Sequence, residues 1–78
     1  MKNIIAVCES GWIICGTENE SKAEYIKLTN ASVVRSWRNG KGIGGLAVAS
    51  NVNEYTLDKI GDVKINTNKV LFTIPCEW

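Results

Sequence analysis

Apolar residues in this chain occur mostly in short runs or in alternation, and few of them have helical spacing. A continuous apolar, β-rich run predicts a buried strand over residues 2–8. Further short strands are predicted over residues 12–17, 24–29 and 32–37. Asn30 marks a tight turn between the last two of these strands. The first half of the chain therefore predicts four consecutive strands.

Glycine modifies two of the predicted elements. Gly16 lies inside the strand over residues 12–17 and indicates a bulge or a close approach of another backbone. Residues 43–50 have the spacing of a short helix. The double glycine within that segment costs a helix about 1 kcal/mol per residue relative to alanine. We therefore expect tertiary contacts to hold this helix, or its backbone to come close to something.

The last part of the chain predicts a hairpin, with strands over residues 62–66 and 69–74. The predicted order of elements is then β-β-β-β-α-β-β. This order favours a mostly β fold of the α+β class, in the form of a small antiparallel sheet or a partly open barrel with one short helix. The length of the chain allows a single domain over residues 1–78.

The small size of the chain predicts self-association. A domain of 78 residues buries only roughly 60–65% of its unfolded surface and usually needs disulfides, a metal or oligomerisation. The three cysteines are odd in number, and no signal peptide precedes them, so we expect reduced thiols in the cytoplasm. Without histidine or a Cys-x-x-Cys pair, neither a metal nor another cofactor is expected. The first apolar run is too short to span a membrane.

The charges are unevenly distributed along the chain. Residues 25–53 carry four cations and no acid, whereas the rest carries five cations and eight acids, for a net charge of +1. A local basic segment on a nearly neutral body suits a discrete anionic ligand better than a long nucleic acid. The basic segment is therefore the first candidate for a binding site.

Within that segment, residues 37–45 contain four glycines, two cations and a tryptophan. They are predicted to run from the end of a strand to the start of a helix, where unpaired N–H groups and a positive partial charge attract anions. Cationic side chains and glycine N–H groups can bind phosphate, and a tryptophan can stack on a base. The predicted ligand-binding residues are Arg35, Trp37, Arg38, Asn39, Gly40, Lys41 and Gly42.

Each of these features also has a purely structural interpretation. The glycines can simply satisfy the backbone geometry of a connection, and Trp37 can belong to the core or to an oligomer interface. Lys41 is followed by glycine rather than serine or threonine, which excludes a Walker A motif. The chain has no histidine to serve as the base of a Ser or Cys triad. We therefore expect no catalytic residue and no enzyme activity.

Several short motifs resemble a family of small phage and prophage proteins whose function is unknown. The matching residues are Ser10-Gly11, Gly16, Ile26, Leu28, Asn30-Ala31, Val34-Arg35, Trp37, Gly42-Ile43-Gly44, Leu46-Ala47 and the closing Thr73-Ile74-Pro75-Cys76. The resemblance implies a phage origin, a small β-rich body and a location in the cytoplasm of an infected bacterium. It implies no catalytic residue.

Two kinds of function are compatible with these observations, and nucleic-acid binding by the basic segment is a weaker third. In the first, a homo-oligomer sequesters a small phosphorylated ligand, by analogy with other phage proteins a cyclic or linear nucleotide signal of host defence. In the second, the protein inhibits a host defence protein by binding it through its acidic hairpins and through Trp12 or Trp78.

Overall fold

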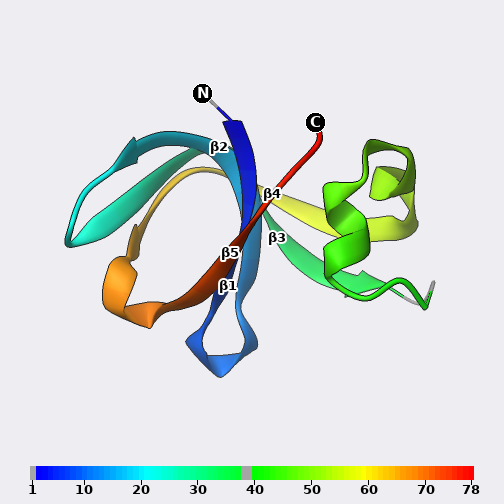
Figure 1. The fold of residues 1–78 in the computed structure, drawn as a ribbon, viewed down its shortest axis with the longest axis horizontal. Helices are drawn as coiled ribbons and strands as arrows, with labels where there is room; N and C mark the ends of the chain where they lie inside the picture. Colours follow the sequence, from blue (N-terminus) through cyan, green and yellow to red (C-terminus); the bar gives the residue numbers. More distant parts are fainter. Residues whose placement is uncertain (1, 38–39) are drawn as a thin grey trace.

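The computed structural model describes residues 2–37 and 40–78, and within them five strands form one open antiparallel sheet (Figure 1). The mostly β, antiparallel class predicted from the sequence is confirmed. The order across the sheet is β4-β3-β2-β1-β5. The strands are β1 (Lys2–Cys8), β2 (Ile13–Ser21), β3 (Tyr25–Trp37), β4 (Tyr55–Asn66) and β5 (Val70–Pro75). Short 3-10 helices connect them: η1 (Glu9–Gly11), η2 (Gly44–Ala47), η3 (Ala49–Glu54) and η4 (Thr67–Lys69).

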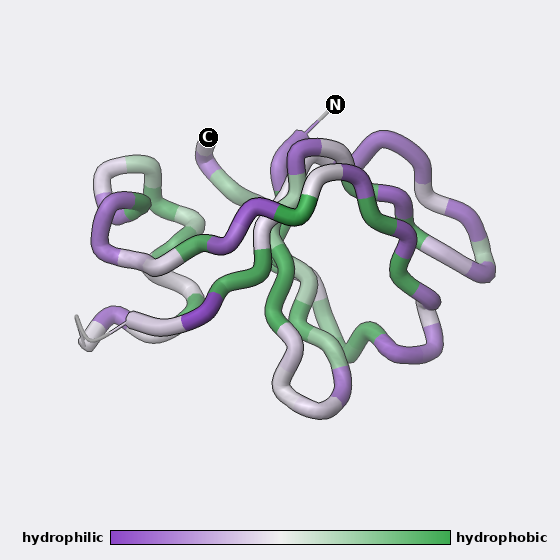
Figure 2. Tube along the Cα trace, turned by 180° about the vertical axis from the view of Figure 1, so that it is seen from behind, coloured by the Kyte–Doolittle hydropathy of each residue, from purple (hydrophilic) through white to green (hydrophobic). Residues whose placement is uncertain are grey.

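The inner strand β1 is buried on both faces, because two separate apolar clusters lie on opposite sides of the sheet. Its alternate residues Ile4, Ala6 and Cys8 belong to one cluster, which includes Leu28 of β3. Ile5, which points the other way, belongs to the second cluster together with Leu46 of η2. This explains why the run over residues 4–7 is continuously apolar, and Figure 2 shows the hydrophobic residues gathered along the central strands.

The two strands predicted over residues 24–29 and 32–37 form one long strand, β3. Asn30 has a positive φ of 50°, but instead of the predicted tight turn it makes a bulge inside the strand. Ala31 beyond the bulge pairs with Gly61 of β4, which also has a positive φ. The extra residue shifts the alternation by one, so that Leu28 and Ala31 lie in the same cluster. The bulge lets one strand serve both clusters.

No α-helix occupies the segment predicted to be helical, residues 43–50. The chain instead forms η2 and η3, which are separated by Val48 in an extended conformation (ψ 120°). The bonds from Leu46 N to Ile43 O and from Val48 N to Gly45 O span three residues, as in a 3-10 helix. The double glycine at the start, the β-branched Val48, and Ser50 and Asn51 at the end leave too little helix propensity for four-residue bonding.

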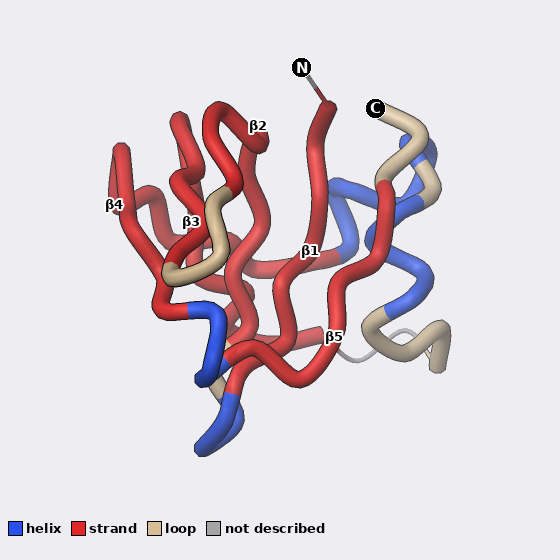
Figure 3. The backbone as a smooth tube through the Cα atoms, turned by 60° about the vertical axis from the view of Figure 1, so that its left-hand side comes forward, coloured by secondary structure: helices blue, strands red, loops and turns tan. Residues whose placement is uncertain are grey.

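The predicted hairpin over residues 62–66 and 69–74 is wrong in its pairing, although both segments are strands. β4 pairs with β3, and β5 pairs with β1, so the two strands lie at opposite edges of the sheet. The sheet curls enough for the three residues of η4 to connect these edges (Figure 3). Alternation identifies a strand but not its partner, and the sequence prediction paired the nearest neighbours.

The turn between β1 and β2 contains the non-glycine residue Ser10 in the left-handed region, at φ 63° and ψ 19°. This conformation costs an L-residue about 1–2 kcal/mol. We expect Ser10→Gly to raise the free energy of unfolding by about 0.5 kcal/mol, because the relieved strain exceeds the added freedom of the unfolded chain. Urea denaturation measures the change. Gly11→Ala, which places alanine at φ 81°, is the opposite control and should destabilise; a less stable Ser10→Gly variant would contradict the argument.

Candidate functional site

Five of the seven predicted ligand-binding residues lie in the part of the chain that the structure describes. Arg35 and Trp37 lie at the end of β3, and Gly40, Lys41 and Gly42 lie in the connection from β3 to η2. Arg38 and Asn39 lie outside the described residues. The contacts of the five described residues therefore decide what this segment can offer a ligand.

Lys41 is held by side chains of η3. Its Nζ donates to Glu54 Oε2 at 2.6 Å and to Asn51 Oδ1 at 3.1 Å. Glu54 balances the ammonium charge, and the same Asn51 donates from Nδ2 to Gly45 O at 3.0 Å. These contacts tie the connection to η2 and η3, which favours a structural role for Lys41.

Arg35 also faces an acid, across the pairing of β3 with β4. Its Nε lies 3.5 Å from Asp58 Oδ2, and 70% of the Arg35 side chain is exposed to solvent. A pair so exposed contributes roughly 0–1 kcal/mol, because water already solvates both charges. The guanidinium is therefore accessible but partly neutralised.

Trp37 packs against Tyr55, with ring centroids 5.6 Å apart and planes at 40°. Both side chains belong to the second apolar cluster, and Trp37 is half-buried. The Tyr55 hydroxyl donates to the carbonyl oxygen of Gly42. At least part of the Trp37 ring is thus used inside the protein, as the structural interpretation predicted.

The glycines of the connection have two different roles. Gly40 and Gly42 have φ values of 73° and 67°, which side-chain-bearing residues rarely adopt. Gly45 allows close packing instead, because a Cβ there would lie 2.5 Å from the Tyr55 hydroxyl oxygen and 2.6 Å from Lys41 Cβ. The double glycine was expected to bring the backbone close to another group, and at Gly45 that group is the Tyr55 side chain. Gly16 behaves similarly, with a virtual Cβ 3.0 Å from Ala31 Cα, so its predicted close approach is confirmed.

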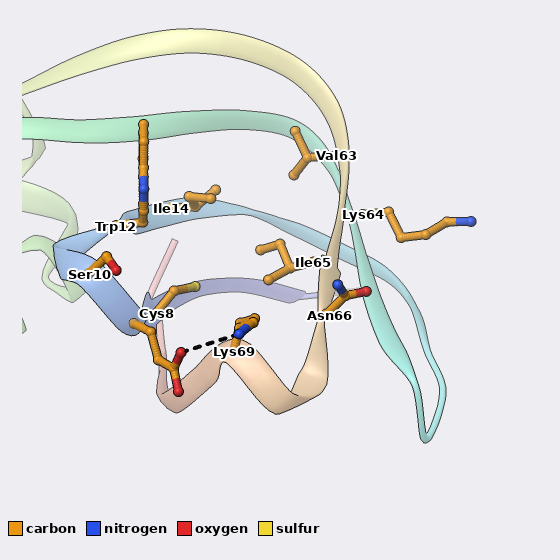
Figure 4. A pocket seen from close by; sticks show the side chains of 10 residues that line it. Cys8, Ser10, Trp12, Ile14, Val63, Lys64, Ile65, Asn66 and Lys69 are labelled. Carbon is orange, nitrogen blue, oxygen red and sulfur yellow. Dashed lines mark ion pairs between the residues drawn. The ribbon is translucent and has the colours of Figure 1, made fainter.

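A pocket of about 490 Å³, which the sequence analysis did not predict, opens at the other end of the sheet (Figure 4). We call it the Trp12 pocket. Its apolar lining comes from three strands and the turn before β2: Cys8, Trp12, Ile14, Val63 and Ile65. Because β4 is not paired with β1 or β2, Val63 and Ile65 face Cys8 and Ile14 across the curled sheet. The pocket is thus the open mouth of the first apolar cluster.

The rim of the Trp12 pocket is polar. Glu9 of η1 and Lys69 of η4 form an ion pair across it, with Nζ 3.5 Å from Oε2. Both side chains are more than half exposed, so the pair is weak. Lys64 lines the pocket with its stem, while its ammonium lies 4.5 Å from the centre of the Tyr25 ring and points outward in Figure 4. Two cations and one acid therefore surround an apolar interior.

Exposed apolar side chains gather around the same end of the sheet. Trp12, Leu71 and Phe72 are 58%, 63% and 51% exposed. In the register of the sheet, Phe72 lies opposite Val7, and Cys8 N donates to Trp12 O. The three residues therefore lie near the end of β1 along the backbone, and we call them the apolar end. Among the described residues, the other exposed large apolar residues are Val48 and Ile60.

The sequence contained weak signals for this region. Trp12 follows a Ser-Gly turn directly, which places it at the end of a hairpin where burial is difficult. The register of β5 on β1, and so the position of Leu71 and Phe72, could not be read from the pattern because β5 was assigned another partner. Sequence reasoning therefore named Trp12 but not its neighbours.

The three cysteines are free thiols and offer little chemistry. Burial raises the pKa of Cys8 and Cys15 above the ordinary value, and burial followed by the charge of Cys15 raises the pKa of Cys76 to about 11. A high pKa leaves little thiolate at neutral pH. Among residues 2–37 and 40–78, no three His, Cys, Asp or Glu side chains are grouped as metal ligands.

Thiol reactivity provides a direct check on the environment of Cys76. At pH 8 the pKa of about 11 lowers its thiolate fraction about a hundredfold relative to a thiol of pKa 9. The more basic thiolate recovers about tenfold of this in nucleophilicity. We expect iodoacetamide to alkylate the folded protein about tenfold more slowly than glutathione, and the rate to rise toward that of glutathione in urea. Equal rates in the folded state would contradict the raised pKa of Cys76.

Comparison with known proteins adds no relative: no protein-family model, curated protein or solved structure matches the chain. No helix in the described part of the chain has the length and apolar character needed to cross a membrane. The function of the protein is therefore inferred from the residues of this chain alone.

Proposed function

We propose that this protein is a non-catalytic binding domain that docks on a partner protein through its apolar end, Trp12, Leu71 and Phe72. The observation that carries the proposal is the presence of three exposed large apolar residues near the end of β1, one of which, Trp12, also lines a pocket. Exposed large apolar side chains beside polar residues are typical of interaction sites. Tryptophan in particular is enriched among the residues that dominate binding energy.

The other parts of the protein-binding hypothesis have less support. Trp78 is used internally, because its Nε1 donates to Leu46 O at 2.8 Å and it packs on the second cluster. In the acidic hairpin, Glu20 accepts from the Tyr25 hydroxyl at 2.7 Å and pairs with Lys22. These two bonds lower the pKa of Glu20, in that order of importance. Of the residues named in that hypothesis, Trp12 is the one best placed to contact a partner.

Binding of a small phosphorylated ligand at the glycine-rich connection is the second candidate function. One observation favours it: the exposed pair of Arg35 with Asp58 is weak enough for a phosphate to displace the carboxylate. The left-handed Gly40 and Gly42 have open space on the side where a Cβ would project. In its full form, this candidate has a nucleotide signal of host defence as the ligand and a homo-oligomer as the binding form. It also includes a phage origin, which depends on the resemblance described above.

A capture experiment with matched variants tests the first candidate. Three immobilised proteins are exposed in parallel to a bacterial lysate: the wild type, a Trp12→Ser/Phe72→Ser variant and an Ile60→Ser control. Ile60 is also exposed, but it lies on β4, away from the apolar end. We expect the double variant to retain at least about tenfold less of a specific protein, and the control to retain it fully. The purified pair should reproduce this difference. Equal retention by all three proteins would overturn the proposal.

Two further measurements separate the alternatives. Light scattering reports whether the partner is a second copy of the chain. If the wild-type protein is a dimer and the Trp12→Ser/Phe72→Ser variant is a monomer, the partner is a second copy and not a foreign protein. Calorimetry with cyclic and linear nucleotides tests the second candidate, with Arg35→Ala as the variant. The second candidate would replace the first if a nucleotide binds saturably, Arg35→Ala weakens that binding, and the capture experiment retains no specific protein.

A further inference from the structure

We infer that the Trp12 pocket accepts one large apolar side chain from a partner segment whose neighbouring residues are acidic. This inference rests on the proposed function and specifies the chemistry of the partner. Pockets of about 300–1,000 Å³ with a mainly apolar lining and a few polar groups are typical binding sites, and the Trp12 pocket has about 490 Å³. That volume accommodates an aromatic side chain and part of the chain that carries it.

The lining of the pocket determines the kind of anchor. Ile14, Val63 and Ile65 offer only apolar groups to the interior, so a charged or strongly polar anchor would lose hydration without compensation. Trp12 stands at the mouth with more than half of its side chain exposed (Figure 4). An inserted aromatic ring can contact the tryptophan face and also cover the apolar wall, which removes both surfaces from water.

The rim determines the residues that flank the anchor. The chain on either side of an inserted side chain lies over the rim, where Lys64 and Lys69 outnumber Glu9. The Glu9–Lys69 pair is exposed and long, so a carboxylate of the partner can share Lys69 at little cost. The ammonium of Lys64 points away from the pocket in Figure 4 and lies over the Tyr25 ring, so it adds positive charge beside the rim and not in the interior. The net positive rim therefore favours acidic neighbours.

Short blocked peptides test this inference without knowledge of the partner. The probes are acetyl-Asp-Phe-Asp-amide, acetyl-Lys-Phe-Lys-amide and acetyl-Asp-Ala-Asp-amide, titrated into the isotope-labelled full chain at low salt. We expect saturable NMR shifts at the Trp12 indole and at the Ile14 and Ile65 methyl groups with the first peptide. The lysine peptide should bind about threefold more weakly, the size of one exposed charge interaction, and the alanine peptide should cause no shift at the pocket.

Variants assign the two parts of the interaction. Trp12→Ala should weaken both phenylalanine peptides, Lys69→Gln should reduce only the preference for the acidic one, and Ile60→Ala should change neither. The preference should also shrink as salt is added, because the rim charges are exposed. Absence of pocket shifts at millimolar peptide, or equal binding of the acidic and basic peptides, would overturn the inference.

The results of the two experiments remain distinguishable. If no peptide enters the pocket but partner capture still depends on Trp12 and Phe72, the proposed function stands and the anchor inference fails. If the acidic peptide fills the pocket but capture is unchanged in the Trp12→Ser/Phe72→Ser variant, the pocket is a site of another use and the proposed function fails.

Discussion

Replacement of Leu46 by alanine is expected to lower the free energy of unfolding by about 3 kcal/mol, within the range for buried leucines. Leu46 is fully buried, although it lies in a four-residue 3-10 helix outside the sheet. Its side chain attaches η2 to the second cluster, against Ile5 of β1 and Val34 of β3. Because the short helices have little stability of their own, removal of this side chain leaves a cavity and also loosens the segment around it.

Thermal denaturation measures this effect. For a domain of this size, 3 kcal/mol corresponds to a decrease in Tm of roughly 12–24 °C. Val48→Ala is the matched control, because Val48 lies two residues further along and is 37% exposed. We expect the control to cost less than about 1 kcal/mol. A similar loss in both variants would show that residues 44–54 do not pack on the sheet as described.

Replacement of Gly45 by alanine is expected to destabilise the protein by about 2 kcal/mol, the usual cost of forcing extra volume into a packed site. The new Cβ would lie 2.5 Å from the Tyr55 hydroxyl oxygen and 2.6 Å from Lys41 Cβ. Neither atom can move away at low energetic cost. The Tyr55 hydroxyl is hydrogen-bonded to Gly42 O, and Lys41 Cβ is attached directly to the backbone. The connection between β3 and η2 should shift as a result.

The adjacent Gly44 provides the control for this prediction. A Cβ at Gly44 meets no atom within 4 Å, and the residue does not have a positive φ. Gly44→Ala should therefore stabilise the protein by about 0.5 kcal/mol, because alanine reduces the freedom of the unfolded chain. Opposite signs at neighbouring glycines, measured by urea denaturation, would establish that packing on Tyr55 determines the requirement at Gly45. Equal losses at both positions would contradict it.

The hydrophobic pattern predicted the strands well where it was regular, and failed where a bulge shifts the alternation of side chains. The bounds of β1 were predicted correctly, because a continuous apolar run flanked by polar residues has few alternatives. Asn30 was recognised as a break, but a left-handed asparagine is compatible with both a turn and a bulge. Only the pairing of Ala31 with Gly61 decides between these, and that contact is distant in sequence.

The basic segment illustrates a different limit. Residues 25–53 contain no acid, so the sequence suggested an isolated positive patch. In the structure, Glu54 and Asp58 lie just beyond that segment in sequence and reach back to Lys41 and Arg35. Charge counted along the chain therefore did not predict charge in space. The Trp12 pocket was missed for a related reason, since one wall comes from β1 and β2 and the other from β4, which pairs with neither of them.

The pairing of the last strand with the first has a consequence for biosynthesis. Residue 4 meets residue 75, so the outer edge of β1 has no partner in the sheet until residues 70–75 have left the ribosome. Contacts so distant in sequence delay folding, because a large loop must close before they form. Until then the nascent chain exposes the hydrogen-bonding edge of an apolar strand, which makes prompt release and low local concentration important for its yield.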